Sequence, residues 1–328
     1  METRRPTNPA AEQLLGLYFP VLDHGFLALV DYMGSDEDVE RAARVSYGHG
    51  TRRTSETRGL IRYLRRHRHT TPSEMVEMKF HCAMPIFVAR QWVRHRAASL
   101  NEYSGRYSLM PLLFYKPERE QLQAQSRANR QGRAGVPLDH LYDEAVARWE
   151  RLRQVAAEQY EWLATHDVAR ELARIDLPLS LYTQWYWKID LHNLLHFLTL
   201  RVDPHAQYEI RAYGRVIAGM LQRVAPLSFE AWIDYDVAGV RLSRVELEAV
   251  RRLVQVTGDA GLASRDGAAV GGPELRALGL SEREIRELVA KLAHPPAVED
   301  FTLDLGAARP PEAFARMMEA AVPRIDRP

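Results

Sequence analysis

Apolar and polar residues alternate along the chain from Met75 to Met84, and this is the most regular pattern in the sequence. Val76, Met78, Phe80 and Cys82 fall on one side of the alternation, and charged or imidazole side chains fall on the other. A period of two predicts a half-buried strand. Two further apolar segments, Phe26–Met33 and Leu179–Ile189, also predict strands.

Longer segments predict helices. Ser35 and Asp38 form a capping-box pattern before a helix over Val39–Val45, and Pro85 precedes another at the first-turn position where proline is tolerated. The predicted loops are His67–Thr71 and Leu100–Tyr107. The other predicted helices are Ser55–Arg66, Ile86–Arg96, Leu138–Leu163, Asp167–Ile175, Asp190–Arg201 and Ala206–Val224.

The character of the chain changes after about Val237. Arg244–Val256 predicts a helix, Thr257–Pro273 is rich in glycine and alanine, and Ser281–Leu292 predicts a short capped helix. Nearer the middle, residues 119–137 are polar and predict a surface insertion. We therefore expect an α+β fold, with a mixed or antiparallel sheet flanked by long helices over residues 1–236. Residues 237–328 are expected to form a helical C-terminal extension without an assigned role.

Composition narrows the functional classes. The chain has 328 residues, 46% of them apolar, and a net charge of +1, so no global field points to nucleic acid or to an anionic membrane. No apolar run reaches the roughly 18 residues of a membrane span, and Met1–Asn8 is polar with no signal-peptide core behind it. One cysteine, Cys82, permits no internal disulfide. A cytoplasmic protein is the expectation.

The densest polar segment reads RHRAASLNEYSGR from Arg94 to Arg106. The planar fork of arginine suits bidentate capture of phosphate, Gly105 allows the backbone to approach an anion, and Glu102 is a natural acceptor for sugar hydroxyls. The chemistry indicated is one or two phosphorylated, sugar-bearing ligands. The alternative, a helix C-terminus carrying cations that favour its dipole, accounts less well for so many polar positions in one register.

This segment resembles the defining motif of the flavin-dependent thymidylate synthases, RHRxxSxNExSxR, and has every fixed position of it. The resemblance extends from about Asp23 to Asp236. It implies an enzyme that methylates dUMP to dTMP, with 5,10-methylenetetrahydrofolate as one-carbon donor and FAD reduced by NADPH, and that yields tetrahydrofolate. It also implies a homotetramer whose active sites are shared between subunits. The matching segments are His24–Gly34, Arg41–Gly48, His69–Glu74, Pro85–Arg96, Glu171–Thr183 and Leu200–Ile210.

The resemblance also implies residue roles. Residues expected to contact FAD are Ser46, His69, Thr71, Arg94, His95, Arg96 and Glu102, with Asp190, Leu191, His192 and His196 approaching from another subunit. Residues expected to contact dUMP are Gln91, Trp92, Val93, Arg94, Glu102, Tyr103, Ser104, Gly105, Arg106, Arg174 and Arg201. The family commonly has asparagine where His196 stands, and often asparagine and arginine at Asp190 and His192.

The residue types fit a reaction without a protein nucleophile. Cys82 lies on the apolar side of its predicted strand, where a small core residue is the better interpretation. Within the family, reduced flavin supplies hydride and the folate supplies the methylene. Arg201 would stabilise an enolate-like uracil, which makes it the predicted catalytic residue. Ser104 lacks an activating base, so we expect it to bind ligand. His69 would stack on the flavin or gate the substrate channel.

Two other classes compete with this hypothesis. His192 and His196 are four residues apart and share a helix face, with His205 following, which suggests zinc; but Asn193 stands where the HExxH pattern needs glutamate. The arginines between Arg52 and Arg68 could serve a nucleic-acid-binding module, although a solvated helix face explains most of them. We expect no metal and no nucleic-acid partner.

Overall fold

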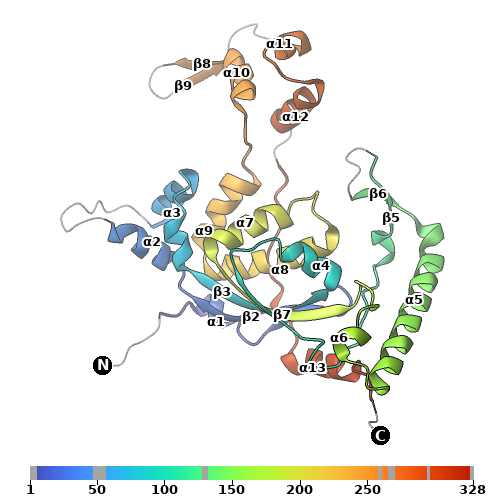
Figure 1. Ribbon diagram of the computed structural model, residues 1–328. Coiled ribbons are helices and arrows are strands. Elements are labelled where there is room, and N and C mark those ends of the chain that lie inside the picture. The colour runs from blue at the N-terminus through green and yellow to red at the C-terminus, as the bar shows by residue number, and fades with distance from the viewer. Residues whose placement is uncertain are drawn as a thin grey trace, which may run out of the picture. The chain divides into compact units, whose positions relative to one another are not determined.

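A computed structural model describes residues 6–46, 57–127, 132–257, 261–264, 270–293 and 296–325. Within these residues, five strands form one sheet in the order β1-β2-β3-β7-β4, and each neighbouring pair is antiparallel (Figure 1). The strands are β1 (Tyr18–Val21), β2 (Gly25–Met33), β3 (Glu77–Pro85), β4 (Ser99–Glu102) and β7 (Tyr182–Asp190). The predicted α+β class is confirmed, and so are the three predicted strands.

The alternation in β3 places its apolar side chains against those of β7. Phe80 pairs with Trp187 and Cys82 pairs with Trp185, and all four side chains are at most 2% exposed. Because side chains of directly opposed residues share a face, the two strands together present one continuous apolar surface. This surface is the centre of the core.

Helices cover both faces of the sheet (Figure 1). On the apolar face, Trp92 lies 5.1 Å from Trp187 and 5.0 Å from Phe197, measured between ring centroids. On the other face, Phe314 lies 4.9 Å from Phe26. The helices concerned are α4 (Ile86–Trp92), α7 (Leu191–Arg201) and α8 (Tyr208–Val224) on the first face, and α13 (Pro311–Ala320) on the second.

Gly25 shows how closely α8 approaches the sheet. The hydroxyl of Tyr213, on α8, donates a hydrogen bond of 2.7 Å to the carbonyl of Ala83 in β3. A Cβ atom added at Gly25 would stand 2.1 Å from the Tyr213 hydroxyl oxygen. Glycine is therefore required at this position, and any larger residue would push the helix from the strands.

Among the remaining helices of this part, α2, α3 and α5 were predicted, whereas α1 and α9 were not. The capping box of Ser35 and Asp38 is present: the Ser35 amide donates to the Asp38 carboxylate over 3.0 Å. The predicted start at Ser55 lies outside the described residues, and the predicted helix over 167–175 is one short turn. The elements are α1 (Pro9–Glu12), α2 (Asp36–Val45), α3 (Thr57–Arg66), α5 (Asp139–Thr165), α6 (Arg170–Ala173) and α9 (Pro226–Trp232).

Three local predictions were wrong. The helix predicted to reach Arg96 ends at Trp92, and the chain then turns toward β4. The loop predicted from Leu100 begins as β4, an edge strand whose four residues are all exposed, so it carries no apolar signal. A loop was predicted up to Thr71, but Thr71 begins a 3-10 helix, η1, that runs to Met75. The segment predicted as a surface insertion, for which no elements were predicted, contains η2 (Arg119–Gln121) and an antiparallel pair, β5 (Gln123–Gln125) and β6 (Arg133–Pro137).

The chain divides into two compact units, Met1–Ala231 with Phe301–Pro328, and Trp232–Asp300. The segment from Phe301 onward, which the sequence analysis assigned to the extension, therefore belongs with the first unit. It returns through η4 (Leu305–Ala307) to α13, and Arg309 forms a β-bridge with Tyr18. No helix among the described residues is both long and apolar enough to cross a membrane.

The second unit has a small core of its own. Buried Ala249, Leu275, Leu280 and Leu288 pack together, and Lys291 donates a hydrogen bond of 2.6 Å to the buried carboxylate of Glu246. Part of the glycine-rich segment forms a hairpin that the sequence did not predict. Its elements are η3, a π-helical turn (Ile233–Val237), α10 (Arg244–Leu253), β8 (Val254–Thr257), β9 (Gly261–Ser264), α11 (Gly272–Ala277) and α12 (Glu282–Ala293).

Candidate active site

The arginine-rich motif lies between the core and the open edge of the sheet. Trp92, fully buried, anchors the end of α4, and the His95 amide donates to the Trp92 carbonyl over 3.0 Å. The chain then joins β4, and the Tyr103 amide donates to Gln184 of β7 over 2.8 Å. Glu102 is oriented there by the Thr183 hydroxyl, which donates to its carboxylate over 2.7 Å. The motif is thus held rigidly at both ends.

Two guanidinium groups of the motif are available to an anion. Arg94 and Arg96 are both exposed. Within the described residues, neither forms a salt bridge or a hydrogen bond with a carboxylate. An exposed arginine without a carboxylate partner keeps its planar fork free for bidentate binding.

Arg201 sits against the motif at the C-terminal end of α7. Its Nε–H donates to Nε2 of His95 over 3.0 Å, and its Nη2 group donates to the Gln91 carbonyl over 3.4 Å. Burial, then the charges of Arg201 and His196, lowers the pKa of His95 to about 4. His95 is therefore neutral near pH 7 and accepts the hydrogen bond. Burial also lowers the pKa of Arg201, although a guanidinium remains charged.

The glycine of the motif lets another arginine approach. A Cβ atom at Gly105 would lie 3.1 Å from Cδ and 3.2 Å from Nη1 of Arg174, and 2.7 Å from the sulfur of Met110. Arg106 pairs with Glu171 across 3.0 Å, and its amide donates to the Ser104 hydroxyl over 3.3 Å. The structure thus places Arg174 beside Gly105, next to Arg106 in the motif, while their role at a phosphate stays a prediction.

The predicted flavin contacts gather along α7. Asp190 caps this helix, accepting from the Asn193 amide over 2.9 Å and from its side chain over 2.7 Å. His196 lies 5.9 Å from His95 between ring centroids. Nδ1 of His192 is buried and, among the described residues, has no hydrogen-bond partner. A buried nitrogen without a partner is an atom whose hydrogen bond a bound ligand can supply.

Other predicted residues occupy less direct positions. η1, which carries exposed Thr71, contacts α7, whereas exposed His69 lies beside Tyr63 at 5.9 Å between ring centroids. Ser46 follows α2 and is exposed. The side chains of Trp92 and Leu191 are fully buried, so they reach a ligand only through their backbone. These roles stay predictions.

Gln207 is a site residue to which the sequence analysis gave no role. Its side-chain oxygen accepts a hydrogen bond from the Gln91 amide group, and its own amide group donates to Glu209 over 2.8 Å. Both residues lie in the Leu200–Ile210 segment that matches the family. The family match was the sequence signal that could have identified Gln207. Spacing in the sequence does not predict its contact with Gln91.

The zinc alternative finds no ligand cluster in the described part of the chain. No three histidine, cysteine or acidic side chains come close enough there to hold a metal ion. His205 instead bonds Asp203, with 2.9 Å between Nδ1 and the carboxylate.

Comparisons with known proteins place this α+β scaffold in one enzyme class. A family model described as thymidylate synthase complementing protein matches residues 28–227. A flavin-dependent thymidylate synthase from Gluconobacter oxydans (strain 621H) is 55% identical over 256 residues, which cover 76% of this chain and 84% of the relative. One from Rickettsia prowazekii (strain Madrid E) is 47% identical over 266 residues, covering 77% and 90%.

A solved structure agrees with these relatives. The UMP/dUMP methylase PolB from Streptomyces cacaoi, bound with 5-Br UMP, is 34% identical and superimposes with a TM-score of 0.60, covering 66% of this chain and 97% of that one. The chain belongs to the flavin-dependent thymidylate synthase family. The family membership and the enzyme class predicted from the motif are both confirmed.

Proposed function

We propose that this enzyme reductively methylates dUMP to dTMP, with 5,10-methylenetetrahydrofolate as one-carbon donor and FAD reduced by NADPH, and that it releases tetrahydrofolate. The reaction is assigned to the unit formed by Met1–Ala231 and Phe301–Pro328. One observation carries the proposal: Arg174 packs on Gly105, while Arg201 joins His95 and Gln91 beside the same motif.

Different arginines would contact different parts of the substrate. Arg174 and Arg106, with the backbone at Gly105 and the hydroxyl of Ser104, would bind the dUMP phosphate. Arg201 would lie at the uracil edge, where its charge stabilises the enolate-like ring whose C5 attacks the one-carbon unit. Neutral His95 holds that guanidinium without adding a charge of its own, because burial and neighbouring charges keep its pKa at about 4. Such preorganised charge stabilisation contributes about 3–4 kcal/mol in other enzymes.

Cys82 is unsuited to attack the substrate. Its side chain is fully buried in β3, and burial raises the pKa of the thiol, so the thiolate needed for nucleophilic attack does not form. As the chain contains one cysteine, the route cannot use the protein thiolate that conventional thymidylate synthases add at C6.

The residues fit a flavin nucleotide. Exposed Arg94 and Arg96 suit its diphosphate, and the orphaned Nδ1 of His192 offers a hydrogen-bonding atom at the start of α7. Thr71 and Glu102 supply further polar groups, and we keep Ser46, His69, Asp190 and His196 as proposed contacts. Bound FAD would supply the hydride after its reduction by NADPH.

We further propose a homotetramer with shared active sites. On α5, Leu152, Val155 and Trp162 are 69%, 60% and 55% exposed. Their spacing places them within one broad side of the helix. An exposed apolar helix face of this kind is typical of a subunit contact. Sedimentation equilibrium should give four times the chain mass; a monomer that is fully active would contradict the shared sites.

One assay tests the reaction. Purified enzyme, expected to be yellow, is reduced under anaerobic conditions and mixed with dUMP and 5,10-methylenetetrahydrofolate, and the product is identified by mass. The expected product is dTMP, with tetrahydrofolate released. A colourless preparation that neither regains flavin nor binds dUMP would overturn the proposal, and so would a methylated product without flavin.

A further inference from the structure

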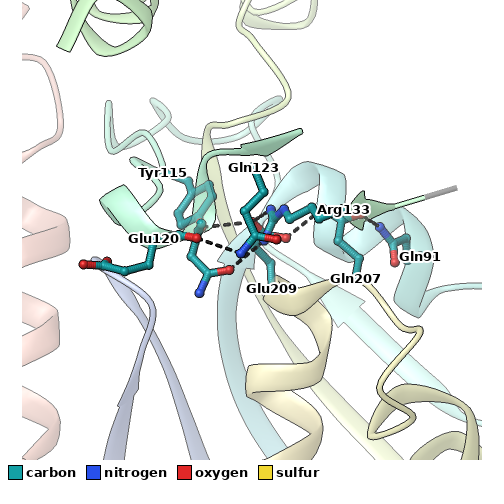
Figure 2. Close-up of polar contacts among 8 residues, drawn as sticks. Gln91, Tyr115, Glu120, Gln123, Arg133, Gln207 and Glu209 are labelled. Carbon is teal, nitrogen blue, oxygen red and sulfur yellow. Dashed lines mark hydrogen bonds and ion pairs between the residues drawn. The ribbon is translucent and has the colours of Figure 1, made fainter. Parts of the chain in front are cut away.

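The polar insertion is connected to Gln91 of α4, which precedes the motif, through a chain of hydrogen bonds (Figure 2). Arg133 of β6 forms an ion pair with Glu209 at the start of α8, although 76 residues separate them in sequence. Glu209 accepts from Gln207 over 2.8 Å, and Gln207 accepts from Gln91 of α4. A segment predicted to be only a surface insertion is thus connected to a proposed dUMP ligand.

The carboxylate of Glu209 fixes which group donates and which accepts in each of these hydrogen bonds. An ionised carboxylate only accepts hydrogen bonds, so Gln207 must turn its NH₂ group toward Glu209. Its oxygen then faces Gln91, and Gln91 must present its own NH₂ group in turn. One N–H of Gln91 is used in this contact and the second remains as a donor. In the reverse orientation, Gln91 would present an oxygen, which repels a phosphate.

Glu209 can orient Gln207 because the other oxygen of its carboxylate already accepts hydrogen bonds from Arg133 and Tyr115. It is 1% exposed, and the same oxygen that contacts Arg133 accepts from the Tyr115 hydroxyl over 3.0 Å. Burial, together with the charge of Glu209, raises the pKa of Tyr115, so its hydroxyl stays a donor. A second guanidinium nitrogen of Arg133 donates to the Gln121 side chain over 2.9 Å, which fixes the fork between η2 and α8.

We propose that Arg133 is a positioning residue for substrate binding: through Glu209 and Gln207 it fixes the side-chain amide of Gln91 so that an N–H points to the phosphate of the nucleotide. The inference rests on the proposed function, because it requires dUMP at the motif. The insertion lies outside the motif. By this proposal it contributes to the preference of the site for a phosphorylated over an unphosphorylated pyrimidine nucleoside.

The test compares two ligands that differ only in the phosphate. Dissociation constants for dUMP and for deoxyuridine are measured by calorimetry on flavin-loaded wild type, Arg133→Gln and Glu209→Gln enzymes. A lost hydrogen bond to a charged group contributes about 1.5 kcal/mol or more, so we expect dUMP to bind about 10-fold more weakly. Deoxyuridine affinity should change by less than about 2-fold, because Gln91 has no phosphate to meet.

Matched variants separate positioning from folding. Arg119→Gln removes another arginine of the insertion, whose partner Asp143 is exposed, and should leave both affinities unchanged. Tyr115→Phe keeps Arg133 and the packing but removes one donor to Glu209; it should weaken dUMP binding by about 3-fold and serves if the other variants are unstable. Melting temperatures for all variants report the fold independently.

Each outcome decides between the possibilities. Equal losses for dUMP and deoxyuridine would mean that Arg133 only maintains the structure, and unchanged dUMP affinity in Arg133→Gln would mean that no relay operates; either result overturns the inference alone. Wild-type enzyme that ignores dUMP would overturn the proposed function, and the inference with it.

Discussion

Two arginine-rich regions of the first unit differ in what surrounds their charges. On α3, Arg58 and Arg62 both pair with Glu230, the second over 2.9 Å. In the motif, Arg94 and Arg96 are exposed and meet no carboxylate among the described residues. The number of arginines is similar in both, but Arg58 and Arg62 share one carboxylate, whereas Arg94 and Arg96 have none among the described residues. Pairing with a carboxylate therefore distinguishes Arg58 and Arg62 from Arg94 and Arg96, although all four lie in arginine-rich segments.

The comparison also bears on the nucleic-acid alternative. A module of that kind needs a basic surface whose charge is available to phosphates. On α3, two arginines form ion pairs with Glu230. Arg66 lies 6.0 Å from the Tyr63 ring centroid in a cation–π arrangement. Arg58 and Arg62 are thus partly neutralised, whereas Arg52 and Arg53 lie outside the described residues, and the absence of a nucleic-acid partner stays a prediction.

Arg201→Ala should have the largest effect on activity. Removing a guanidinium that stabilises developing charge typically lowers kcat by about 100- to 1,000-fold. The flavin should remain bound, because Arg94 and Arg96 are untouched. The measurement is dTMP formation alongside the flavin absorbance per chain. Arg62→Ala, on α3, is the control and should keep nearly full turnover; retained turnover in Arg201→Ala would remove its catalytic role.

Arg96→Ala should lower flavin affinity by about 10-fold, because a hydrogen bond to a charged group contributes about 1.5–3 kcal/mol. Titration of the apo-enzyme with FAD at two salt concentrations measures the effect, and the variant should show the weaker salt dependence. Arg58→Ala of α3, which removes an arginine paired with Glu230, should bind FAD as the wild type does. If the two variants behave alike, the distinction between paired and available arginines fails.

His95→Gln should change how stability responds to acid. The folded-state pKa of His95, about 4, lies below its ordinary value of 6.5. Between these values the unfolded chain binds a proton that the folded chain does not, so stability falls as pH drops from about 6.5 to 4. The ring is half-buried and solvent screens part of the effect. We expect the melting temperature to fall about 2 °C less in the variant between pH 7 and pH 5.

Glu230→Gln should have the smallest effect. The carboxylate and its two arginines are partly exposed, and such pairs contribute about 0–1 kcal/mol. Urea unfolding should show a loss within that range, with kcat and the Km for dUMP unchanged. A large loss of activity would mean that α3 acts on the site, contrary to the comparison.

Much of the fold could be predicted because its signals are local. These signals depend on residues that are close in sequence. Examples are the alternation in β3, the capping box at Ser35 and the long helix after the insertion. β4 escaped prediction because an exposed edge strand has no apolar face, and its partner β7 lies some 80 residues away in sequence. Helix α4 ends at the buried Trp92, earlier than predicted, and nothing in the local sequence pattern marks that end.

The family resemblance supplied candidate site residues, but not the contacts between them. The motif and its family identified Gln91, His95, Gly105 and Arg201, whereas the contacts of Gln91 with Gln207 depend on tertiary structure. The same holds for Arg133, which reads as one more polar residue of a surface segment until Glu209 is seen beside it. The individual ligand roles stay predictions.

The return of the chain from Phe301 to α13 has a consequence for biosynthesis. As the polypeptide leaves the ribosome, residues 232–300 can complete their own core around Leu275 and Leu288 before the first unit is finished. The first unit still lacks Phe314 against Phe26 and the bridge of Arg309 to Tyr18. At roughly 5–20 residues per second, the nascent sheet keeps one side open for seconds until its last helix emerges.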